Sequence, residues 1–121
     1  MTTAAITTWM GVVASERGPR NYTQRLLLLA IGTRMLVEGR ARLRLTLDDL
    51  QRITGLSRNW LIANAGAAAR AGWLQRARDR GAEQGRGWRA YWYEPSVPAE
   101  IEPPRFHVAT AADLHHVEAA A

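Results

Sequence analysis

The sequence predicts one mostly helical α+β domain with a short three-stranded antiparallel sheet, followed by an extended carboxyl-terminal tail. Two short amphipathic runs meet at Gly55 within the stretch LTLDDLQRITGLSRNWL. Arginine and apolar residues alternate over residues 40–45, which is typical of a half-buried strand. A glycine-rich segment, residues 81–87, separates two further strand-like runs, and this arrangement predicts a hairpin.

The first third of the chain is expected to be helical. Residues 4–15 place apolar side chains at helical spacing around a tryptophan, and a glycine-proline pair then breaks the helix. A second helix is predicted over residues 22–38, where leucine is abundant. Asn21 or Thr23 can cap its amino end, and Gly39 is a suitable residue to end it. This second helix is apolar around much of its circumference, so we expect it to be central and buried.

A strand and a short helix should follow. The strand is expected over residues 40–45, and Thr46 is then a good amino-terminal cap for the helix. Asp48 and Asp49 occupy its first turn, where negative charge suits the helix dipole. The helix is expected to stop at Gly55. Its apolar face consists of Leu47, Leu50 and Ile53.

A second short helix and a hairpin complete the predicted domain. Ser57 can cap a helix over residues 58–71, which Gly72 closes. Residues 73–80 and 88–93 then read as the two strands of the hairpin. The inward side of the helix is expected to consist of Leu61, Ala65 and Ala68.

The hairpin is rich in arginine. Alternation along the first strand gives three arginines one face, and two more in the loop and return strand can join them. This predicted basic ridge consists of Arg76, Arg78, Arg80, Arg86 and Arg89. An edge strand protected from aggregation by charge is the alternative. On the return strand, Trp88 and Trp92 lie opposite Tyr91 and Tyr93, and we expect the tryptophans to face the core.

The charge is unevenly distributed along the chain. All sixteen basic residues are arginine, and the formal net charge is +5. Residues 40–89 hold eleven arginines against four acidic residues, a net charge of +7. Residues 94–121 hold one arginine against five acidic residues, a net charge of −4, and are rich in proline at their start. A basic domain with an acidic tail favours a polyanionic partner, although an arginine-rich solvated surface is the alternative.

Several functional classes are not expected. The chain has no cysteine, which excludes disulfides and thiolate metal sites. Its longest apolar run, residues 26–31, is too short to span a bilayer, and the amino end lacks the regions of a secretory signal. His115 and His116 are adjacent and would point apart on a helix, so we expect no metal site. No catalytic set or phosphate loop is visible. We therefore expect a cytoplasmic protein that is not an enzyme and needs no cofactor.

The predicted order of elements is that of a winged helix-turn-helix, and the sequence also resembles this family directly. LDDLQRITGLSRNWL looks like the helix-turn-helix of bacterial winged-helix DNA-binding proteins, and AGWLQRARDRGAEQGRGWRAYWYEP looks like their wing. The amino-terminal stretch is similar to the lead-in helices of phage and plasmid replication-organiser winged helices. The resemblance covers roughly residues 8–95, which predicts a domain over residues 1–95 and a tail over 96–121.

The resemblance implies a double-stranded-DNA-binding protein, with the helix after Ser57 in the major groove. Such a protein would be a transcription regulator or a DNA-binding factor of a phage, plasmid or other mobile element, associated with the nucleoid when bound. Arg58 can bind guanine and Asn59 adenine through paired hydrogen bonds, while the basic ridge would bind phosphates. The residues that the resemblance places against the bases are Ser57, Arg58, Asn59, Trp60 and Ala63.

Other functions and an assembly remain open at this point. A winged helix can serve as an adaptor that binds protein, here through Trp60, Ile62 and the tail. Single-stranded nucleic acid could contact the ridge arginines and two tyrosines of the return strand. The helix around Trp9 lies outside the minimal winged-helix core, and we expect a homodimer through its apolar residues, Trp9, Met10, Val12 and Val13. The acidic tail would then be free to reach a protein partner or the basic face of its own domain.

Overall fold

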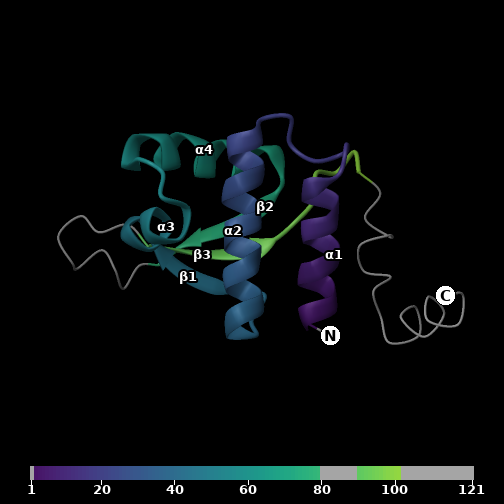
Figure 1. Ribbon diagram of the computed structural model, residues 1–121, viewed down its shortest axis with the longest axis horizontal. Coiled ribbons are helices and arrows are strands. Elements are labelled where there is room, and N and C mark those ends of the chain that lie inside the picture. The colour runs from purple at the N-terminus through teal and green to yellow at the C-terminus, as the bar shows by residue number, and fades with distance from the viewer. Residues whose placement is uncertain (1, 80–89, 102–121) are drawn as a thin grey trace, which may run out of the picture.

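The computed structural model describes residues 2–79 and 90–101. Figure 1 shows helices packed around a small twisted sheet. In chain order the elements are α1 (Thr2–Ala14), α2 (Tyr22–Glu38), β1 (Leu43–Thr46), α3 (Leu47–Thr54), α4 (Arg58–Ala71), β2 (Leu74–Arg78) and β3 (Ala90–Pro95). The predicted α+β fold, mostly helical with a small three-stranded antiparallel sheet, is confirmed for these residues. No helix among them is long and apolar enough to cross a membrane.

The ends of the helices follow from local capping residues. The Asn21 side chain accepts hydrogen bonds from two backbone N–H groups of α2, and the Ser57 side chain accepts one, from Trp60, at the start of α4. Thr46 and Asp49 form a reciprocal capping box at the start of α3. Gly55 ends α3 with a φ of 72°, a left-handed conformation that glycine adopts without a steric penalty. The turn between α3 and α4 was therefore correctly predicted from its sequence.

The sheet has the order β1-β3-β2, with β3 between its two partners. Leu45 pairs with Tyr91 and Arg76 with Tyr93, so these four residues share the face that the helices cover. Tyr93 is only 1% exposed and belongs to the hydrophobic core.

The predicted orientation of the return strand was wrong at the position that the structure describes. Trp92 lies on the face opposite Tyr93, half-buried, with the Arg42 guanidinium 4.2 Å from the centre of its ring. Alternation identifies which residues share a face of a strand, but the packing of the helices decides which face is buried. Trp88 lies outside the described residues.

Helix α1 packs along α2 and contributes to the core of the chain (Figure 1). Ile6, Trp9 and Val13 are fully buried, and Met10 and Val12 pack against the core. The indole N–H of Trp9 donates to the Ser96 carbonyl at 2.7 Å and to that of Trp73 at 3.2 Å, which fastens α1 to the ends of β2 and β3. Burial of these side chains therefore requires no second subunit, and the homodimer stays a prediction that light scattering can test.

The first residues of the predicted tail pack onto the domain. The Ser96 N–H donates to the carbonyl of Trp73, and Pro98 is buried against Gly72 at the end of α4. Val97 and Ile101 pack against the hydrophobic core. The packed part of the chain thus includes residues 96–101, while the remainder of the tail, with its histidines, lies outside the described residues.

Candidate nucleic-acid interface

The amino end of α4 is exposed and polar. Ser57, Arg58 and Asn59 are all exposed, and Ser57 Oγ accepts a hydrogen bond from the backbone N–H of Trp60 at 3.3 Å. The first turn of a helix presents free N–H groups and the positive end of its dipole. These properties suit a negatively charged or electron-rich ligand, such as a phosphate or the acceptor edge of a base.

Arg58 is held by a carboxylate from the preceding helix. Its Nη1 atom donates to Asp48 Oδ1 at 2.8 Å, and both side chains are substantially exposed. An ion pair between exposed groups contributes little to stability and exchanges readily with another anion. The sequence indicated Asp48 only as a favourable first-turn residue, because the approach of α3 to the start of α4 depends on the angle of the intervening turn.

The next exposed residues of α4 are apolar or small. Ile62 is 47% exposed and Ala63 is also exposed, whereas Trp60 is half-buried. Asn64 makes a local hydrogen bond to the Trp60 carbonyl at 2.9 Å and accepts another from Gln24 of α2 at 3.4 Å. The outward surface of α4 therefore carries polar groups at its amino end and apolar groups one turn later.

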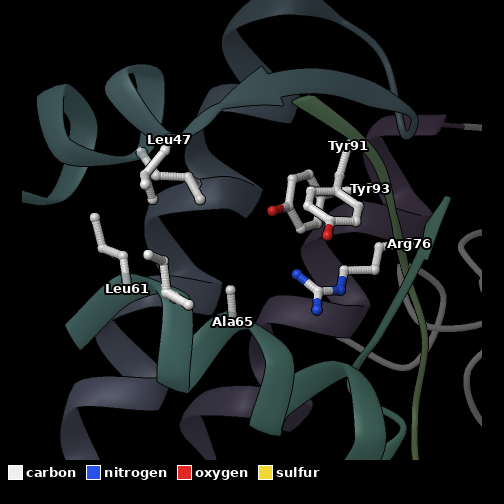
Figure 2. Close-up of a pocket in the computed structure, with 8 residues that line it drawn as sticks. Leu47, Leu61, Ala65, Arg76, Tyr91 and Tyr93 are labelled. Carbon is white, nitrogen blue, oxygen red and sulfur yellow. The ribbon is translucent and has the colours of Figure 1, made fainter. Parts of the chain in front are cut away.

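The structure places the two described arginines of the predicted basic ridge in different surroundings. Arg78 is exposed near the end of β2, whereas Arg76 is half-buried and turned toward the helices. The Arg76 guanidinium lies 4.3 Å from the centre of the Tyr91 ring. Figure 2 shows Arg76 and the hydroxyls of Tyr91 and Tyr93 directed into the space between the sheet and α4. The remaining predicted ridge residues lie outside the described residues: Arg80, Arg86 and Arg89.

Tyr93 is affected by burial and by Arg76. Burial raises the pKa of the Tyr93 hydroxyl, while the positive charge of Arg76 and its hydrogen bond partly oppose this increase. The hydroxyl is therefore protonated at neutral pH. Tyr91 and Tyr93 line an inner space together with Arg76, so they are poorly placed to serve as an open stacking platform for single-stranded nucleic acid.

Two guanidinium groups approach Gly66 in the middle of α4. A Cβ atom at this position would lie 3.1 Å from Arg70 Nη1 and 3.3 Å from Arg76 Nη2. The absence of a side chain thus lets both groups rest against the helix surface. The sequence alone could not reveal this arrangement, because Arg76 comes from another element.

The outer face of the sheet is less basic than the sequence suggests. Arg42 Nε contacts Glu94 at 3.1 Å, and Arg44 Nε forms an ion pair with Asp79. The positive charges of Arg42 and Arg44 are therefore partly neutralised across the sheet, as that of Arg58 is by Asp48.

No protein-family model, curated protein or solved structure matches this chain. Any function assigned to it depends on the geometry and charge of its own residues.

Proposed function

We propose that this protein is a winged helix-turn-helix that binds double-stranded DNA, as a transcription regulator or a DNA-binding factor of a mobile element. The supporting observation is the exposed, Ser57-capped amino end of α4, which carries Arg58 and Asn59. A helix that presents its first residues in this way fits the major groove of B-DNA.

The proposed contacts are of two kinds: contacts to bases, which read the DNA sequence, and contacts to phosphates, which position the protein on the duplex. Arg58 exchanges Asp48 for the O6 and N7 acceptors of guanine, and Asn59 pairs with adenine. Ala63 and the neighbouring Ile62 are suited to apolar contact with a thymine methyl group. These contacts would confer sequence preference, because the major-groove edges of the four base pairs differ.

Phosphate contacts would come from the hairpin. Arg78 is exposed at the end of β2, and Arg80, Arg86 and Arg89 follow it in the sequence. Such contacts position a protein on the duplex and carry no sequence information. Arg76 is left out of this set, because its guanidinium stacks over Tyr91 and faces the helices.

Fluorescence anisotropy with duplexes from around the protein's own gene tests this proposal. Neutralisation of about four phosphates gives a slope of roughly −4 when log affinity is plotted against log salt concentration. A matched single strand should bind more weakly than the duplex. Absence of duplex binding at about 50–100 mM salt, or an affinity that does not change with salt concentration, would contradict DNA binding.

Exposed apolar residues on α2 support a second candidate, an adaptor that binds protein. Tyr22 is 82% exposed and Val37 76% exposed, and Leu26 lies between them on the same helix. Large exposed apolar groups are a common component of protein interaction surfaces. Failure to bind duplex DNA, together with co-purification of a partner that Val37→Ser or Ile62→Ser abolishes, would favour the adaptor.

A further inference from the structure

A cavity of about 70 Å³ lies between the helix-turn-helix and the sheet. Figure 2 shows side chains from both layers directed into it. Its polar wall is formed by Arg76 and the two tyrosines of β3. Its apolar wall comes from α3 and α4 and consists of Leu47, Leu50, Leu61, Ile62 and Ala65.

Arg76 brings a positive charge to this largely apolar space. Within residues 2–79 and 90–101, no acidic side chain forms an ion pair with Arg76 or with Arg70. Instead, Arg76 stacks on Tyr91 and lies opposite the buried Tyr93 in the pairing of β2 with β3. A half-buried guanidinium gains most from a charged acceptor, because its N–H groups form the strongest hydrogen bonds with anions.

A second arginine, Arg70, adds positive charge next to the part of the cavity wall that Ala65 forms. Arg70 and Arg76 both rest against Gly66, immediately after Ala65 in the apolar wall. Arg70 and Arg76 repel one another, because both carry a positive charge, and an anion placed near them relieves that repulsion.

We propose that this cavity binds a short-chain aliphatic carboxylate. Its carboxylate accepts hydrogen bonds from Arg76, and its apolar tail lies against Leu61 and Ala65. A few convergent polar groups at one end of an apolar pocket are the usual arrangement for a small-molecule site. A carboxylate matches the planar donor pairs of a guanidinium.

The volume of the cavity limits the size of the ligand's apolar tail. An apolar protein cavity of about 150 Å³ accommodates benzene. A cavity of about 70 Å³ therefore suits an apolar tail of about three carbon atoms, whose carboxylate lies beside Arg76, and is too small for a tail that contains an aromatic ring. Isobutyrate is a suitable probe, with isobutyramide as a neutral molecule of the same shape and acetate as an anion without the branched tail.

Calorimetric titration of the full chain with sodium isobutyrate, without DNA and at constant ionic strength, tests the site. We expect a Kd on the order of 1 mM, and about tenfold weaker binding for isobutyramide and for acetate. Since no DNA is present, this site and the proposed DNA interface can fail independently.

Matched variants test whether isobutyrate binds in this cavity. Arg76→Gln should weaken isobutyrate binding about tenfold through loss of the charged donors. Arg42→Gln is the control, because Arg42 also stacks on an aromatic ring of the sheet, but on the opposite face. Ala65→Val fills the cavity from α4 and should also weaken binding, which provides a test if Arg76→Gln fails to fold.

Three results with the two probes and the two arginine variants would overturn the proposal. These are the absence of isobutyrate binding at about 20 mM, equal affinity for isobutyrate and isobutyramide, and equal loss of binding in Arg42→Gln and Arg76→Gln. Unchanged binding in a folded Ala65→Val variant would also overturn it, because the tail would then lie elsewhere.

Discussion

In the first turn of α4, Arg58 Nη1 donates a hydrogen bond to Asp48 Oδ1 across the turn that joins α3 to α4, at a distance of 2.8 Å. The carboxylate neutralises the residue proposed to read guanine. It also places a negative charge where the phosphates of a bound duplex would approach. Asp48 is therefore expected to oppose DNA binding, although it forms a favourable contact in the free protein.

Asp48→Asn should raise affinity for duplex DNA about three- to tenfold at moderate salt, because it frees Arg58 and removes a repulsive charge. Stability should fall by no more than about 1 kcal/mol, since the ion pair is exposed and an asparagine remains polar. Anisotropy titration measures the affinity. Glu16→Gln is the control: Glu16 is exposed in the loop after α1, and its loss changes the net charge equally. An equal gain in both variants would indicate a general charge effect and exclude a local role for Asp48.

Readout and positioning can be separated by two arginine variants. Arg58→Ala should cost about 1–3 kcal/mol on a preferred duplex and little on a scrambled one, because the lost contact is to a base. Arg78→Ala should weaken binding to both duplexes alike and flatten the salt slope by about one unit. Parallel titrations at several salt concentrations measure both effects. Indistinguishable behaviour of the two variants would argue against α4 as the reading helix.

The same substitution at two glycines should have opposite effects on stability. Gly66→Ala should raise the free energy of unfolding by up to about 1 kcal/mol, because alanine favours the helix and only the ends of two flexible arginines must move. Gly55→Ala should lower it by about 1 kcal/mol or more, since the φ of 72° is unfavourable for alanine. Urea unfolding followed by circular dichroism measures both changes. Destabilisation by Gly66→Ala would mean that Arg70 and Arg76 cannot move away from the added methyl group.

Trp9 should contribute strongly to the stability of the domain. Trp9→Phe removes the N–H group that donates hydrogen bonds to the Ser96 and Trp73 carbonyls, and it leaves a smaller ring in a fully buried site. We expect a loss of about 2–3 kcal/mol in the free energy of unfolding. Thr7→Ala, at an exposed position of the same helix, is the control. A chain that begins at Asn21 should be unfolded by circular dichroism, and a stable truncated chain would contradict the place of α1 in the core.

Alkaline pH should destabilise the protein through Tyr93. Burial raises the pKa of Tyr93 above its ordinary value of 10.0, so the folded state favours the neutral phenol. This contribution to stability is fully present below pH 10.0 and is lost as the pH rises through the raised pKa. Unfolding experiments above pH 10.0 should therefore show a steeper decline for the wild type than for Tyr93→Phe. Arg76→Gln should raise this pKa further, and an absorbance titration of the tyrosines would reveal the shift.

The local structure of the chain could be predicted closely because its causes are local. Helix α2 begins after Asn21 and ends before Gly39, as its capping residues indicate, and the turn at Gly55 follows from the backbone freedom of glycine. The buried positions of α4, Leu61, Ala65 and Ala68, follow from helical spacing. Each of these features depends on residues within a few positions of one another, so periodicity and capping chemistry suffice to predict them.

The arrangement of the candidate sites depended on contacts between distant segments. Alternation along β2 and β3 could group Arg76 with Arg78 and Tyr91 with Tyr93, but it could not tell which face the helices would cover. The packing of α3 and α4 on one face turned Arg76 and Tyr93 inward and left Trp92 beneath Arg42 on the other. The pairing of Arg58 with Asp48 and the burial of Trp9 likewise required helices to meet at particular angles. Such angles arise from the balance of packing over the whole core, which no short stretch of sequence contains.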